Sequence, residues 1–71
     1  MEIDWIEVCR MLGHDGHEMA RISARLDGSD DVPIKTASLV LLKLRDALAF
    51  SMSEEDRDKA FDEPSIMKAK P

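Results

Sequence analysis

The clearest hydrophobic pattern along the chain lies between residues 34 and 52. Apolar residues recur there at alternating intervals of four and three positions, at Ala37, Leu41, Leu44 and Leu48. This is the period of an α-helix. Residues 39–42 are all apolar, so this part of the helix has no polar side. The pattern predicts a helix over 34–52 whose first half is surrounded by other protein.

Two shorter helices are predicted before it. The first spans about residues 3–12, where the apolar side chains share one face and Gly13 follows as the end. The second spans about 16–27 and precedes Gly28, a residue that readily takes the left-handed conformation found at many helix ends. The residues between them, Gly-His-Asp-Gly, have the composition of a short turn.

A fourth helix is predicted over 54–62, with little apolar content. Ser53 is a suitable N-cap, and three acidic residues follow it in the first turn. No segment alternates apolar and polar residues over the length of a strand. We therefore expect an all-α fold, a small bundle of three to four short helices in a single domain over 1–62, followed by a flexible tail over 63–71.

Composition and charge narrow the classes of function. The 71 residues carry a net charge of −5, which disfavours nonspecific attraction to nucleic acid or to an anionic membrane. The single cysteine excludes an internal disulfide and suits a reducing compartment. The first residues are acidic, unlike a secretory signal, and the longest apolar run is far too short to cross a bilayer. We expect a cytoplasmic protein without a membrane partner.

The stretch CRMLGHDGHEMARIS loosely resembles a helix-turn-helix, in which the second helix enters the major groove of DNA. In that interpretation His17, Arg21 and Arg25 are the candidate nucleic-acid contacts. The sequence departs from the pattern where His14 follows the glycine and Glu18 lies in the first turn. Residues 1–52 also contain nine acidic and six basic residues. The simpler interpretation is a plain loop between two antiparallel helices, and both remain open.

Metal binding and catalysis have little support in the sequence. Cys9, His14 and His17 are the only thiol or imidazole ligands, whereas a structural zinc site needs four ligands. There is no glycine-rich phosphate loop, and neither histidine has an evident nucleophile beside it. We predict no catalytic residue, no metal site and no cofactor.

The acidic residues after position 53 have two interpretations. The simpler is a solvated helix face. The alternative is an acidic docking surface for a basic groove on another protein. Its residues would be Glu54, Glu55, Asp56 and Asp58.

The surplus of apolar residues in the third predicted helix points to association. Two short amphipathic helices and a polar one cannot cover all of its sides, and self-association about a two-fold axis is the commonest way to cover such a face. The predicted interface residues are Leu39, Val40, Leu41, Leu42, Leu44 and Leu48. We therefore expect a small acidic, non-catalytic regulatory or inhibitory protein that acts by protein–protein interaction through a homodimer. The alternative is a helix-turn-helix DNA-binding regulator.

Overall fold

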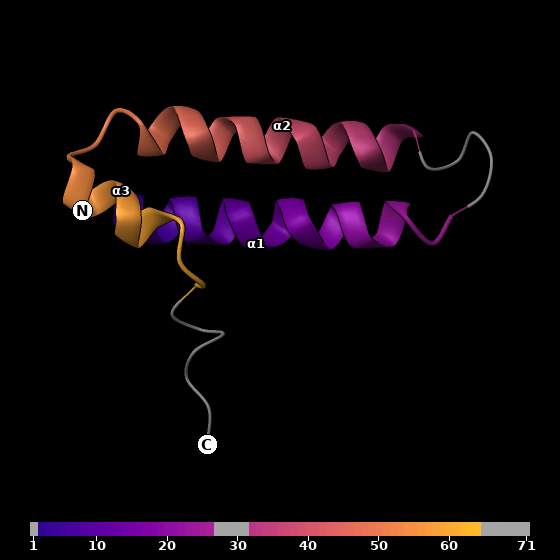
Figure 1. Cartoon of the computed structure of the whole chain (residues 1–71), viewed down its shortest axis with the longest axis horizontal. Helices are drawn as coiled ribbons and strands as arrows, with labels where there is room; N and C mark the ends of the chain where they lie inside the picture. Colours follow the sequence, from indigo (N-terminus) through magenta and orange to yellow (C-terminus); the bar gives the residue numbers. More distant parts are fainter. Residues whose placement is uncertain (1, 27–31, 65–71) are drawn as a thin grey trace, which may run out of the picture.

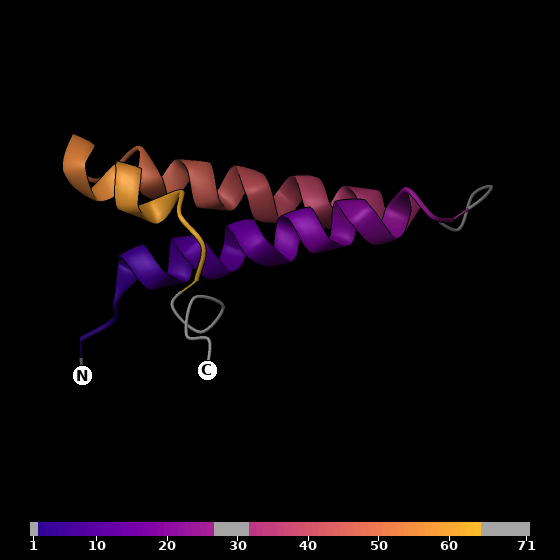
Figure 2. The same ribbon diagram turned by 60° about the horizontal axis from the view of Figure 1, so that its bottom comes forward.

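The structure, a computed structural model of one chain, describes residues 2–26 and 32–64. Within these ranges the chain forms three helices and no strand: α1 (Trp5–Ser23), α2 (Val32–Ala49) and α3 (Glu54–Ala60). Figure 1 shows α1 and α2 side by side as an antiparallel hairpin. In Figures 1 and 2, α3 lies at the end of the hairpin where α1 begins. The predicted all-α class, a small helical bundle, is confirmed.

The first two predicted helices are one helix, which corrects the predicted turn at 13–16. The backbone is helical without interruption from Trp5 to Ser23, and both Gly13 and Gly16 are buried within it. The helix begins where the sequence suggested: Asp4 is the N-cap, and its Oδ1 accepts a hydrogen bond from the Glu7 backbone N–H at 3.1 Å. The other predicted end, at residue 27, lies outside the described residues.

The glycines stay helical because they let α1 and α2 approach closely. The Ser38 hydroxyl on α2 donates a 2.7 Å hydrogen bond to the backbone carbonyl of Gly16. A Cβ at Gly16 would lie 2.8 Å from Cγ and Cδ2 of Leu42. Glycine inside a helix costs about 1 kcal/mol relative to alanine. Here the close packing offsets that cost, so the glycine signal in the sequence marks a helix contact rather than a turn.

The small residues of α1 form the row that faces α2. They recur at alternating intervals of four and three, which keeps them on one side of a helix. The row consists of Cys9, Gly13, Gly16, Ala20 and Ser23. Its partners on α2 run in the opposite order. Gly13 lies beside Arg45 and Gly16 lies beside Leu42.

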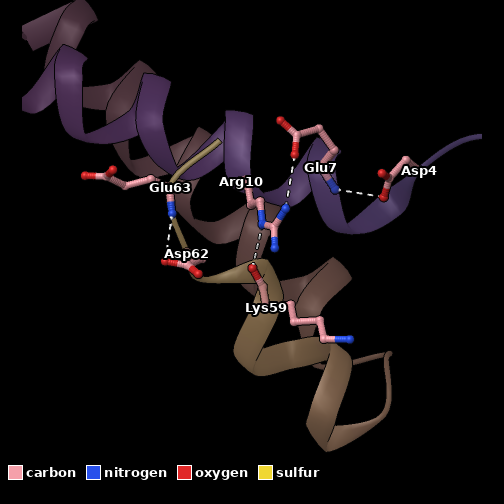
Figure 3. Close-up of polar contacts among 6 residues, drawn as sticks. All are labelled: Asp4, Glu7, Arg10, Lys59, Asp62 and Glu63. Atoms are coloured by element: carbon pink, nitrogen blue, oxygen red, sulfur yellow. Dashed lines mark hydrogen bonds and ion pairs between the residues drawn. The ribbon is translucent and has the colours of Figure 1, made fainter. Parts of the chain in front are cut away.

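The short helix α3 confirms the predicted fourth helix. The Ser53 hydroxyl accepts a 3.2 Å hydrogen bond from the Asp56 backbone N–H, as an N-cap does. Arg10 of α1 holds the other end: its Nε donates a 2.8 Å hydrogen bond to the Lys59 carbonyl, and its Nη1 lies 3.3 Å from Glu7 Oε1 (Figure 3). These contacts attach α3 chiefly to α1.

Aromatic contacts continue this attachment beyond the end of α3. The Phe61 and Phe50 rings meet edge to face, with their centroids 6.0 Å apart. The Arg45 guanidinium lies 4.7 Å from the Phe61 centroid, and that of Arg57 lies 4.7 Å from the Phe50 centroid. Pro64, the last described residue, is buried.

The interior enclosed by the three helices is small. Among the described residues, the hydrophobic core consists of three fully buried side chains: Cys9, Ala49 and Ala60. All three are small, so together they remove little apolar surface from water. Most of the larger apolar side chains are only half-buried or are exposed. A single chain therefore has a weak core of its own.

The buried thiol gives this core a pH dependence. Burial raises the pKa of Cys9 above the ordinary value of 9.0, and the positive charge of Arg45 opposes part of that rise. Because the folded state favours the protonated thiol, its contribution to stability is complete below pH 9.0 and is lost as pH rises beyond it. We expect the urea midpoint to fall more steeply between pH 8 and 10 than that of Cys9→Ala. Equal slopes for the two proteins would contradict this.

Candidate functional site

Exposed and half-buried apolar side chains of α1 form a second row, separate from the one that faces α2. It follows the same alternation of three and four positions along the helix, and every member except Asp15 is apolar. This α1 row consists of Trp5, Val8, Leu12, Asp15, Met19 and Ile22. It crosses the two glycines without a break, which is possible only because α1 is continuous.

A matching row runs along α2 and is entirely apolar. It has the same alternation and consists of Ile34, Ala37, Leu41, Leu44 and Leu48. Four of these residues are half-buried, and Leu44 is 47% exposed. Apolar residues at this spacing on one helix are the usual signature of a face that packs against other helices.

Both rows lie on the side of the hairpin opposite to α3. On the α3 side, a groove of about 460 Å³ brings Ala20 and Ala24 of α1 together with Leu39 and Leu42 of α2. The α3-contacting residue Arg10 belongs to the same side of α1 as these alanines, because positions 10, 13, 17, 20 and 24 follow one another at helical spacing. The two apolar rows occupy the remaining side, which α3 leaves uncovered. We call the two rows together the open face.

The open face is broad. Each long helix extends about 27 Å at 1.5 Å per residue, and neighbouring helix axes lie about 8–10 Å apart. A face about 20 Å wide and 27 Å long covers about 500 Å², or about 1,000 Å² when two such faces meet. That total reaches the lower bound of specific protein–protein interfaces.

The structure divides the six predicted interface residues among different surroundings. Leu41, Leu44 and Leu48 belong to the open face, although Leu48 also packs against the chain's own core. Leu42 packs against Gly16 inside the hairpin, and Leu39, 54% exposed, lines the groove on the α3 side. The apolar residues of the α1 row also belong to the open face, and they were not predicted as interface residues from the sequence. The signal that identifies them is their helical spacing, which continues through the segment predicted to be a turn.

Val40, the last of the six, lies at the outer edge of α2 and is 58% exposed. This outer edge also carries Leu44, Ala47 and the exposed Lys43, and it has no acidic side chain. The outer edge of α1 differs, because acidic residues lie among its apolar ones. Its members include Asp4, Glu7, Met11, Asp15, Glu18 and Ile22. The open face thus has one edge with carboxylates and one edge without them.

The residues proposed to contact nucleic acid do not belong to a helix-turn-helix, because the turn that this motif requires is helical. His17 and Arg21 line a cleft of about 270 Å³ between α1 and the segment after α3. Arg21 lies 3.6 Å from Glu18 in an ion pair, and Arg25 is exposed just beyond the end of α1. The geometric basis of the DNA-binding alternative is therefore wrong.

The predicted acidic docking residues all lie on α3. Glu54, Glu55 and Asp58 are exposed and Asp56 is half-buried. Their backbone is fixed by the Ser53 cap, and Lys59 lies 3.9 Å from Glu55. An acidic first turn also stabilises the helix through its dipole. Both sequence interpretations, solvated helix face and docking surface, are compatible with this placement.

The residues considered for a metal site point in different directions. Cys9 is buried, with its Sγ 3.8 Å from the Arg45 carbonyl, while His14 Nδ1 lies 3.3 Å from Asp15 Oδ1. Within residues 2–26 and 32–64, no three histidine, cysteine or acidic side chains come close enough to hold an ion. None of the helices formed by these residues has both the length and the hydrophobicity needed to cross a membrane.

Comparison with known proteins gives no relative: no protein family model, curated protein or solved structure matches this chain.

Proposed function

We propose that the chain is a small non-catalytic protein that regulates or inhibits by binding other protein, and that it does so as a homodimer assembled through the open face. The open face carries this proposal. It holds ten apolar residues and one carboxylate over two helices, and α3 covers only one end of the opposite side of the hairpin. Monomeric proteins rarely leave an apolar surface of this extent in water.

A second copy of the chain is the occupant that the folding requirement favours. Among the described residues, the enclosed core has only three fully buried hydrophobic side chains, all small, with the partly buried Leu48 and Met52 packed against them. A chain with so small a core needs its open face covered by other protein whenever it is folded. A second copy of the chain is always present to cover it. Two hairpins that meet through their open faces form a four-helix bundle, a common arrangement with a continuous apolar interior.

The chemistry of the chain supports a non-catalytic role. The thiol of Cys9 is fully buried and burial raises its pKa, which opposes a role as a nucleophile. The regulatory or inhibitory action would then come from the surfaces that the dimer leaves exposed.

Sedimentation equilibrium tests the proposal directly. At micromolar concentration and neutral pH we expect a mass of twice the 8.0 kDa of one chain. If the hairpin stays folded as a monomer, dilution should dissociate the dimer without changing the helical signal. If folding and association are coupled, the helical signal should fall as the dimer dissociates. A mass of 8.0 kDa for a folded chain across the micromolar range would overturn the proposal.

A further inference from the structure

Two hairpins that face each other through their open faces can obey two-fold symmetry in two ways. With the axis parallel to the helices, α1 of each copy lies against α2 of the other. With the axis across the helices, α1 lies against α1 and α2 lies against α2. Neighbouring helices are antiparallel in both arrangements, so helix packing alone does not choose between them.

The charges at the edges of the open face favour the first arrangement. The edge of α1 carries four carboxylates, those of Asp4, Glu7, Asp15 and Glu18, of which Glu7 and Glu18 are ion-paired with Arg10 and Arg21. Pairing α1 with α1 would bring the carboxylates of Asp4 and Asp15 toward those of the other copy as water is excluded, and like charges repel more strongly there than in water. Pairing α1 with the edge of α2 avoids this repulsion, because that edge has no carboxylate and carries Lys43.

The large exposed apolar side chains at the two edges lie at different heights along the bundle. A rotation about an axis parallel to the helices leaves every residue at its own height along the bundle. The register inside the hairpin, where Gly13 lies beside Arg45 and Gly16 beside Leu42, therefore also sets the register between the copies. At these heights, Val40 of one copy is level with Glu18 of the other and Leu44 is level with His14. Both side chains therefore lie between the heights of Met11 and Ile22.

This arrangement covers the side chains that a single chain leaves in water at both edges. Met11 and Ile22 are each 38% exposed, Leu44 is 47% exposed and Val40 is 58% exposed. An apolar side chain contributes most to the free energy of association when its neighbour across the interface is also apolar and both are removed from water. The alternative pairing would place Met11 and Ile22 beside the carboxylates of a second α1 edge.

We propose that the homodimer is built with α1 of each copy against α2 of the other, so that the C-terminal ends of both α1 helices lie at the same end of the bundle. This inference rests on the proposed function, because it specifies how the open face is occupied. It also places both α3 helices at the other end, on opposite outer sides of the bundle.

Engineered cysteines test the pairing in the full chain. Met11 of one copy and Ala47 of the other lie at the same height, since each is two residues beyond the Gly13–Arg45 pair. In a Cys9→Ala background, Met11→Cys with Ala47→Cys should form a covalent dimer under mild oxidation. Each single cysteine variant is the matched control and should stay uncrosslinked. A double variant that remains reduced while the protein is dimeric would overturn the proposed pairing.

A distance measurement supplies an independent test. Arg25→Cys in the same background places a spin label just beyond the end of α1. The proposed pairing puts both labels at one end of the bundle, about 15–20 Å apart at ordinary helix spacings. The alternative pairing puts them at opposite ends, more than about 30 Å apart. A long distance in a protein of dimeric mass overturns the pairing but not the proposed function, whereas a monomeric mass overturns both.

Discussion

Leu44→Asp should convert the dimer into monomers over the concentration range where the unmodified chain associates. Leu44 belongs to the open face and is 47% exposed in the single chain, so the substitution leaves the hairpin contacts intact. Fully burying an exposed leucine stabilises by about 1.5–3 kcal/mol. Because Leu44 is already about half-buried in the single chain, the two copies in a symmetric dimer together contribute about 1.5–3 kcal/mol. We therefore expect the dissociation constant to rise at least about 10-fold, measured by sedimentation equilibrium.

Leu39→Asp is the matched control for this experiment. Leu39 lies on the same helix and has a similar exposure of 54%, but it lines the groove on the α3 side. The same chemical change at this position should leave the dissociation constant within a few-fold of its original value. Equal weakening by both substitutions would show that the open face does not form the interface.

Gly16→Ala should destabilise the protein, although alanine is the better helix former. The added Cβ would lie 2.8 Å from Cγ and Cδ2 of Leu42 and 3.4 Å from Cβ of Leu41. Because Cγ is the branch point of the leucine side chain, α2 itself must move or Leu42 must change rotamer. Overpacking of this kind costs about 1–3 kcal/mol. We expect thermal unfolding to occur about 5–15 °C lower at equal protein concentration.

Gly13→Ala separates the packing effect from helix propensity. Its Cβ would meet only the outer part of the flexible Arg45 side chain, with Cδ and Nη1 each at 3.0 Å. That side chain can shift, so the helix propensity gain of about 1 kcal/mol should remain largely intact. We expect an unchanged or raised unfolding temperature. The same loss of stability at both glycines would contradict the close approach of α1 and α2 at Gly16.

Helical periodicity in the sequence was enough to determine the fold class and the approximate extent of two elements. The apolar spacing at 34–52 corresponds to α2 at Val32–Ala49, and the Ser53 cap with its acidic first turn corresponds to α3. Both signals are local. A helix period and a capping side chain act within a few residues of each other, so they can be recognised without knowing the neighbours in space.

The tertiary structure decided what the two glycines do. Glycine followed by polar residues is compatible with a turn and equally with a close helix contact, and only a second helix opposite distinguishes the two. Here α2 lies opposite, with Ser38 bonded to the Gly16 carbonyl. Because α1 is continuous through this contact, the turn of a helix-turn-helix is absent and the apolar residues between positions 5 and 22 lie in one row.

The tertiary structure likewise decided which leucines are available for binding. The apolar side chains of residues 39–42 point to all sides of α2. The sequence therefore determined only that the chain has more apolar surface than three short helices can cover. The placement of α1 and α3 divided that run among the hairpin contact, the groove and the open face. Which side of a helix becomes an interface depends on which sides its own chain covers, and that is a property of packing rather than of local sequence.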